Sequence, residues 1–222
     1  MNNENFNKAY LEVLNNNQSE YQEETDNRLE YLISKYSDLE VITKQDVIDL
    51  LNIALIDEFL AEFNYYASYN LSKTDGKADF DPEFQQHEDE ERSHRKDITN
   101  RLRELGASVP TIKLQEFPRS NSNGENWKQA ATDISNDLLL DRYNEELGAI
   151  KFYGLIFSVL KKLPLEERDT TTEMLIKHLK ADEEEHAKDL KDLLIEHGVL
   201  QNSSDETDEE RAINGSEMEE NE

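Results

Sequence analysis

The chain has 222 residues, enough for one domain with tails, and its formal net charge is −27 at pH 7. Phosphate binding needs clustered Lys and Arg, so this charge argues against nucleic acid or an anionic membrane as a partner. The lack of cysteine excludes disulfides, thiolate zinc sites and rubredoxin-type iron centres. The sequence has neither an apolar run near the ~18 residues of a membrane span nor a signal peptide, so a soluble cytoplasmic protein is expected.

Residues 1–42 are predicted to form an N-terminal extension that is partly helical. They are rich in Asn and weakly patterned, but one stretch places apolar side chains at helical spacing. These side chains are Leu29, Leu32, Ile33 and Tyr36. They predict one short amphipathic helix before the main body.

Two long helices are predicted next. Residues 43–46 resemble a capping box and open the first helix, which is expected to run to about Ser72. Asp81, followed by proline, is expected to be the N-cap of the second helix, with the proline in its first turn. Gly106 is expected to end this second helix. The short link between them predicts an antiparallel hairpin.

A long polar connection is predicted over residues 107–125, which hold two prolines and a Ser-Asn-Ser-Asn-Gly run. The third helix is expected from about Trp127 or Asp133 to Lys162. A Leu-Pro pair then interrupts the pattern before the next helix. One long crossover between two hairpins is an arrangement found in four-helix bundles.

A fourth helix is predicted from about Leu165 to Gly198. The predicted fold class is therefore all-α, with an antiparallel four-helix bundle over residues 43–199. Residues 200–222 are strongly acidic and almost without apolar side chains, so a disordered tail is expected.

Two segments of the chain, residues 90–97 and 182–189, share one pattern. Each has an acid four residues before a histidine, a Glu three before it, a Glu ten after it and a Gly twelve after it. Glu-x-x-His places both side chains on one face of a helix. In a chain with 51 acidic residues this motif alone is close to chance.

The other two helices supply the specificity of the pattern. Residues 58–65 and 146–153 both read Glu-x-x-Ala-x-x-x-Tyr, and the two pairs of copies have nearly the same offset in the sequence. An internal repeat of a whole hairpin explains both offsets. Acids and histidines thus interrupt apolar seams, where ionised groups are rarely buried unless they are paired or bind metal.

With these motifs, residues 44–198 resemble the ferritin-like superfamily, and most closely bacterioferritin and related small ferritins. The resemblance implies two iron ions per chain. Each of the two predicted hairpins would supply three ligands. The implied ligands, which are also the catalytic residues, are Glu58, Glu91 and His94 for one ion and Glu146, Glu183 and His186 for the other. It further implies that Glu91 and Glu183 bridge both ions. A hydrogen-bonded core network without metal is the alternative interpretation.

The donor types and the departures from the family refine the expected cofactors. Oxygen and imidazole ligands suit iron or manganese, and zinc would also bind. In bacterioferritins an axial haem Met directly follows the Glu of the second helix. Arg92 stands there in this chain, so haem is not expected.

Four further side chains are expected near the metals. Tyr65 and Tyr153 lie two turns beyond Glu58 and Glu146, where their phenols would hydrogen-bond the ligand carboxylates, or else serve as core aromatics. Glu62 and His87 are predicted to lie near each other beside the diiron site. The pair would be an accessory cation site or iron route, or a simple polar pair. In the other half of the repeat, the positions that correspond to Glu62 and His87 are the apolar Ile150 and Leu179.

The function implied is a ferroxidase that oxidises Fe(II) with O₂ or H₂O₂, for iron storage or for peroxide and iron detoxification. The resemblance implies a hollow homo-oligomer. Two alternatives stay open. One is another diiron or dimanganese oxidoreductase, such as a peroxidase or catalase. The other is a non-catalytic structural or cargo protein on the same bundle.

Overall fold

The computed structural model describes residues 18–39, 41–74, 80–109 and 134–201, and every long element among them is an α-helix. These helices are α2 (Gln18–Ser37), α3 (Lys44–Thr74), α4 (Asp81–Glu104), α6 (Ile134–Lys162) and α7 (Thr170–Glu196). The all-α prediction is confirmed. The expected acidic tail, the crossover and a helix start at Trp127 lie outside the described residues.

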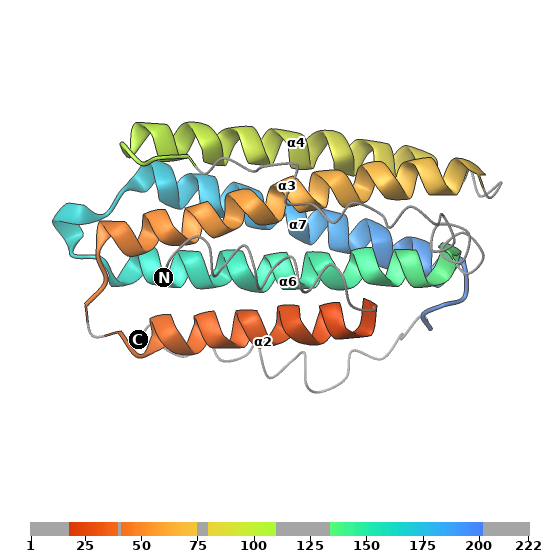
Figure 1. The fold of residues 1–222 in the computed structure, drawn as a ribbon, viewed down its shortest axis with the longest axis horizontal. Helices are drawn as coiled ribbons and strands as arrows, with labels where there is room; N and C mark the ends of the chain where they lie inside the picture. The colour runs from red at the N-terminus through yellow and green to blue at the C-terminus, as the bar shows by residue number, and fades with distance from the viewer. Residues whose placement is uncertain (1–17, 40, 75–79, 110–133, 202–222) are drawn as a thin grey trace, which may run out of the picture.

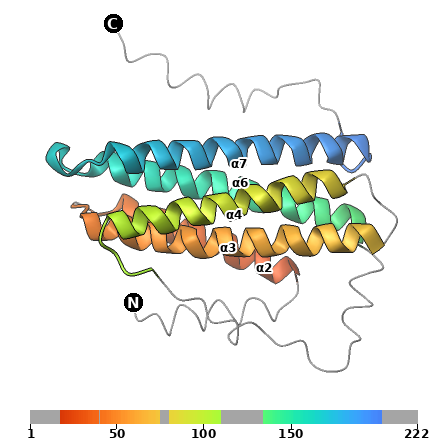
Figure 2. The same ribbon diagram turned by 90° about the horizontal axis from the view of Figure 1, so that it is seen from above.

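Four of the helices form an elongated bundle. α3 packs along α4 and α6 packs along α7, and smaller contacts join α3 to α6 and α4 to α7 (Figure 1). Figure 2 shows the pair α3 and α4 lying beside the pair α6 and α7, with all four helices nearly parallel to one long axis. None of the described helices combines the length and the apolar content that a membrane span needs.

Local signals in the sequence set the bounds of α3 and α4. The predicted capping box of α3 is confirmed, because the Thr43 backbone N donates to Asp46 Oδ2 over 2.9 Å and the Asp46 backbone N lies 3.4 Å from Thr43 Oγ1. At α4 the N-cap is Phe80, one residue earlier than expected, and the carboxylate of Asp81 accepts a hydrogen bond from Ser72 instead. Gly106 ends α4 with a φ of 76°.

The start of α7 differs from the sequence prediction. A 3₁₀ turn, Leu165–Glu167, comes first, and the α-helix begins only at Thr170. The reason is the N-cap Asp169, whose side chain accepts hydrogen bonds from the backbone N atoms of Thr171 and Thr172. Gly198, with a φ of 71°, ends this helix as expected.

Helix α2 is longer than the short helix that was predicted and packs on the outside of the bundle, alongside α6 (Figure 1). Leu29, Leu32 and Tyr36 are buried as the spacing indicates, but Ile33 is 39% exposed. Arg28 joins α2 to α3 through two hydrogen bonds to the carboxylate of Asp57, of 3.0 and 2.7 Å.

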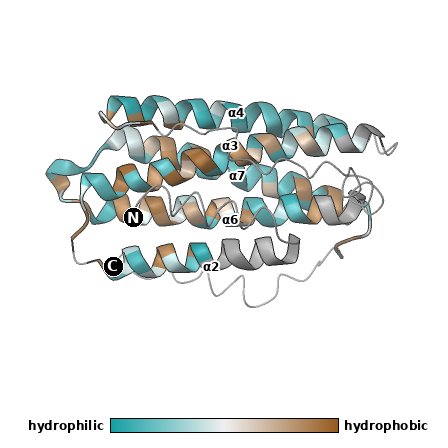
Figure 3. Cartoon of the chain, in the orientation of Figure 1, coloured by the Kyte–Doolittle hydropathy of each residue, from teal (hydrophilic) through white to brown (hydrophobic). Residues whose placement is uncertain are grey.

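The buried face of α4 is one row of residues at the predicted spacing. Most of the α4 surface is hydrophilic, whereas α3 and α6 carry long hydrophobic stretches (Figure 3). The buried row is Phe84, His87, Glu91, His94, Ile98 and Leu102. A polar centre therefore lies in the middle of an otherwise apolar seam.

Two apolar clusters fill the bundle, one toward each end. The larger includes Leu55 of α3 and Ile98 of α4, and the smaller includes Tyr65 of α3 and Phe84 of α4. The acidic and histidine positions of α3 and α4 fall between these residues along the helices. An apolar layer thus covers each end of the polar centre and excludes water from it.

Candidate metal centre

The six predicted metal ligands meet at the middle of the bundle. One comes from α3, one from α6, and a Glu-x-x-His pair comes from each of α4 and α7, so all four helices contribute. Each of the six is at most 4% exposed. They are Glu58, Glu91, His94, Glu146, Glu183 and His186. The i,i+3 spacing turns both members of each pair toward the axis of the bundle.

Three carboxylates surround the inner nitrogen of His94. Its Nδ1 lies 3.3 Å from Oε2 of Glu58, 3.3 Å from Oε1 of Glu183 and 3.5 Å from Oε2 of Glu91. Ligand atoms from these four residues all lie within 4.8 Å of one another. This is a donor set of one imidazole and three carboxylates.

The same arrangement recurs around His186. Its Nδ1 lies 3.2 Å from Oε1 of Glu91, 3.5 Å from Oε2 of Glu183 and 3.9 Å from Oε2 of Glu146. These four residues again place ligand atoms within 4.8 Å of one another. Glu91 and Glu183 belong to both sets, and each turns one oxygen toward each histidine.

The donor atoms of the centre fit metal ions better than they fit one another. Buried side-chain atoms without a hydrogen bond in the described structure include an oxygen or inner nitrogen of five of the six residues: Glu58 Oε2, Glu91 Oε1, His94 Nδ1, Glu183 Oε1 and His186 Nδ1. Buried polar atoms that have only ion-pair contacts and no hydrogen bond are rare. Their convergence on one small volume is the signature expected of a metal site.

The ionisable groups balance one another in charge. Burial and the neighbouring Glu91 raise the pKa of Glu58 well above its usual value, and burial and Glu183 do the same for Glu146. Burial alone would raise the pKa of Glu91, but contacts with His186 and His94 outweigh it and hold that pKa at about 2.

Both histidines of the candidate centre are held in the protonated form by the same carboxylates. Burial disfavours the imidazolium, but the carboxylates of Glu183, Glu58 and Glu91 raise the pKa of His94 far above its usual value. The carboxylates around His186 act in the same way. The two positive charges of the imidazolium rings therefore balance the two negative charges of Glu91 and Glu183, while Glu58 and Glu146 are neutral.

Two buried tyrosines reach across the bundle to the outer carboxylates. The phenol of Tyr153 on α6 donates a hydrogen bond to Oε1 of Glu58 on α3, and the phenol of Tyr65 on α3 donates to Oε1 of Glu146 on α6. Both rings are 1% exposed. Each tyrosine therefore fixes a carboxylate of the other hairpin, so the two halves of the repeat hold each other in place.

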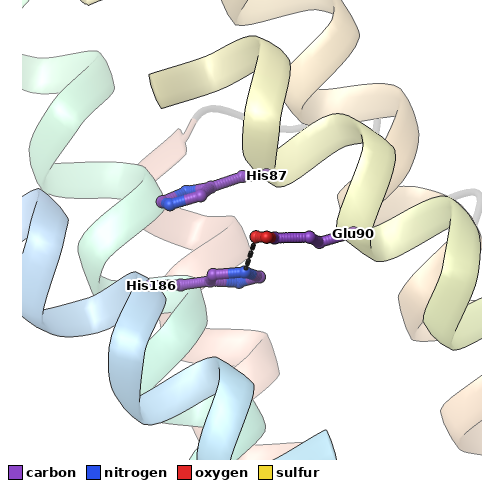
Figure 4. A group of neighbouring side chains, drawn as sticks. All are labelled: His87, Glu90 and His186. Carbon is purple, nitrogen blue, oxygen red and sulfur yellow. Dashed lines mark hydrogen bonds and ion pairs between the residues drawn. The ribbon is translucent and has the colours of Figure 1, made fainter. Parts of the chain in front are cut away.

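Two acids that carry no predicted role bind the outer nitrogens of the histidines. Nε2 of His186 lies 2.8 Å from Oε2 of Glu90, as Figure 4 shows, and Nε2 of His94 lies 3.1 Å from Oδ2 of Asp182. Such a partner fixes the ring and keeps a proton on Nε2, so that Nδ1 would become the ligand atom once it loses its own proton to an entering metal ion. In the sequence each of these acids lies four residues before one histidine, and in the structure it binds the histidine of the other helix.

The structure does not bring Glu62 and His87 together. Glu62 accepts hydrogen bonds from Nε of Arg92 over 2.9 Å and from Nε of Arg95 over 2.6 Å, on the flank between α3 and α4. The two arginines thus pair with the carboxylate of Glu62, and no contact among the described residues joins it to His87.

His87 lies inside the bundle beside the metal centre. Its ring stacks on that of His186, with centroids 4.1 Å apart (Figure 4). It also meets the Tyr65 ring edge-on at 5.0 Å. Burial, followed by the charge of His186, lowers the pKa of His87 to about 3. The ring is therefore neutral near pH 7.

Comparisons with known proteins agree with this architecture. The family model described as "Ferritin-like domain" matches residues 48–196, which include all six residues of the centre. The bacterioferritin-related protein from Bacteroides fragilis, described as a dodecameric thioferritin, is 28% identical, with a TM-score of 0.56 and coverage of 78% of this chain and 95% of that chain.

A second solved structure shows the same fold. Bacterioferritin BfrA from Mycobacterium tuberculosis is 19% identical, with a TM-score of 0.56 and coverage of 72% of this chain and 91% of that chain. No curated protein matches the sequence.

Proposed function

The chain belongs to the family of ferritin-like domains, and on this premise we propose that it is a diiron ferroxidase. It would bind two Fe(II) ions per chain and pass their electrons to O₂ or H₂O₂, for iron storage or for detoxification of iron and peroxide. Two Fe(II) ions supply two electrons. With two protons, these convert O₂ to H₂O₂, or H₂O₂ to two waters.

One observation carries the proposal. Glu91 and Glu183 are 1% exposed, and each presents one oxygen to the donor set of His94 and the other to that of His186. Two ions held by the same pair of carboxylates would sit close together, which suits a two-electron reaction. A core network built only for packing has no need of two carboxylates that each span both histidines.

The charges of the centre also support two divalent substrate ions. Glu58, Glu91, Glu146 and Glu183 together offer four negative charges when ionised, which two Fe(II) ions neutralise. The protons that now hold Glu58 and Glu146 neutral and the two imidazoles cationic would leave as the ions enter. The net charge of the centre would then be near zero both before and after the two ions bind. Binding would therefore place no net charge in the core.

The remaining polar residues would hold the donors in place. Tyr65 and Tyr153 fix the outer carboxylates, while Glu90 and Asp182 set the tautomer and orientation of the two imidazoles. The apolar layers on either side keep bulk water away from the reacting ions. Preorganised donors of this kind lower the reorganisation that each oxidation step needs.

Anaerobic Fe(II) titration followed by exposure to air tests the proposal. The wild-type chain is expected to bind about two ions at this centre, and air is expected to raise ferric absorbance, whereas the double variant Glu58→Gln/Glu146→Gln should bind about two ions fewer and give no ferric absorbance. The matched control is Asp89→Asn/Glu184→Gln, which removes two charges from exposed positions of α4 and α7. Equal iron uptake by Glu58→Gln/Glu146→Gln and by the wild type would refute the assignment.

We also propose that the protein is a homo-oligomer. The support is the likeness to the Bacteroides fragilis protein, whose description is dodecameric. Native mass measured together with iron content per chain tests it. A large particle holding far more than two ions per chain would indicate storage, and a monomer would contradict the proposal.

A further inference from the structure

His87 is a buried polar side chain with no hydrogen bond. It is 0% exposed, and neither of its ring nitrogens makes a hydrogen bond to any residue that the structure describes. Leaving a buried donor or acceptor unpaired costs about 1–3 kcal/mol. The position therefore needs an explanation other than packing.

The internal repeat shows that the fold does not need a histidine here. The position that corresponds to His87 in the other half of the repeat is Leu179, which is likewise 0% exposed. The counterpart of Glu83, one turn earlier on α4, is Leu175 of α7, which is also apolar. One half of the bundle thus fills this place with two leucines, while the other half has an imidazole and a carboxylate.

Two carboxylates face the unpaired imidazole. Oε1 of Glu83 lies 3.7 Å from Nε2 of His87, and ligand atoms of Glu83, His87 and Asp189 all lie within 4.8 Å of one another. Ligand bonds of about 2.1 Å around one ion place neighbouring donors roughly 3–3.5 Å apart. A small inward movement of half-buried side chains would bring these three donors to that spacing.

We propose that Glu83, His87 and Asp189 bind a third divalent ion of the first transition row, separate from the two ions of the diiron centre. One imidazole and two carboxylates favour Fe²⁺, Co²⁺ or Zn²⁺ over Mg²⁺ and Ca²⁺, which prefer oxygen ligands alone. The ion would also offset the repulsion between the two facing carboxylates.

The site opens to solvent on one side and reaches the diiron centre on the other. The side chains of Glu83 and Asp189 are 29% and 27% exposed, whereas His87 is fully buried and stacks on His186. Lys188 lies 3.6 Å from Asp189, but its own side chain is 70% exposed and can swing away. An ion can therefore reach the carboxylates from solvent without opening the bundle.

A second grouping of His87, with Glu90 and His186, fits an ion less well. Nε2 of His186 is already bonded to Glu90, and Figure 4 shows this bond beside the stacked ring of His87. An ion there would have to break the contact that orients a ligand of the diiron centre. We therefore assign the third ion to Glu83 and Asp189.

Titration with Co²⁺ alone, in anaerobic buffer with excess Mg²⁺ to occupy sites made only of oxygen donors, tests the assignment. The wild type is expected to bind about three Co²⁺ per chain and the double variant Glu83→Gln/Asp189→Asn about two. His87→Leu, which copies the residue of the other half of the repeat, should also bind about two. The visible spectrum of bound Co²⁺ should lose one component in both variants.

Two controls separate this site from the diiron centre. Asp89→Asn/Asp192→Asn removes two charges from exposed positions on the same two helices and should keep about three ions. Glu58→Gln/Glu146→Gln should keep about one ion, and that ion should disappear when Glu83→Gln and Asp189→Asn are added. If Glu83→Gln/Asp189→Asn binds as many ions as the wild type, the third site is refuted, whether or not the diiron centre loads.

Discussion

The crossed tyrosines give a sharp test of how the proposed centre would hold metal ions. Tyr153 donates to Glu58 and Tyr65 donates to Glu146, and all four side chains are at most 4% exposed. Replacement of either tyrosine by phenylalanine removes one oxygen and keeps the buried ring. The packing therefore stays, and the carboxylate loses the donor that fixes it.

The expected magnitude follows from the burial of these carboxylates. A buried acceptor that loses its donor costs about 1–3 kcal/mol, and about 1.4 kcal/mol corresponds to a factor of ten in affinity. Tyr153→Phe should therefore weaken the ion held by Glu58 and His94 by about 10- to 100-fold. This range agrees with the usual effect of removing a hydrogen-bond partner of a metal ligand.

Calorimetric titration with Co²⁺ in the absence of O₂ measures the effect. Tyr153→Phe should weaken binding of one of the two ions of the diiron centre, Tyr65→Phe should weaken binding of the other, and the double variant should weaken both. Tyr66→Phe, at a position 53% exposed on the same helix as Tyr65, is the control and should match the wild type. Wild-type binding of both ions by Tyr153→Phe would refute the role given to these phenols.

Three other outcomes are expected. Loading should release about four protons per chain, because two imidazolium rings and the carboxyls of Glu58 and Glu146 deprotonate, so affinity should rise with pH. Calorimetry in buffers of different ionisation enthalpy counts these protons, and a pH-independent affinity would contradict the charge balance. Glu62→Gln should leave the iron oxidation rate unchanged, because Glu62 pairs with arginines, and a stopped-flow rate severalfold lower would show otherwise. Ile98→Ala should lower the free energy of unfolding by about 2–5 kcal/mol in urea, since this side chain is 0% exposed; a loss under about 1 kcal/mol would contradict its place in the core.

The helical pattern and the internal repeat predict the bundle, and the resemblance to the ferritin-like superfamily adds the six residues of the centre. Helical periodicity sets which side chains of α4 are buried, because the six buried ones recur at helical spacing along one face. The boundaries followed where local chemistry decided them, as at Thr43 and Gly106. At α7 the cap by Asp169 overrode the apolar pattern that pointed to an earlier start.

The contacts around the centre are harder to predict from the sequence. Two side chains at the same height on neighbouring helices can each bind a different residue. Glu62 and His87 lie one turn from the ligands on antiparallel helices, but Arg92 and Arg95 attract Glu62 to the flank. A carboxylate that faces His87 is that of Glu83, on its own helix one turn earlier, 3.7 Å away and without a hydrogen bond. Only the packed structure shows which of several nearby acids faces each histidine.

The most direct test of the bridged diiron centre is anomalous diffraction at the iron edge from crystals loaded with Fe(II) in the absence of O₂. We expect two strong peaks per chain between His94 and His186, with Glu91 and Glu183 each contacting both. A single peak there, or two ions that share neither carboxylate, would contradict the bridged centre.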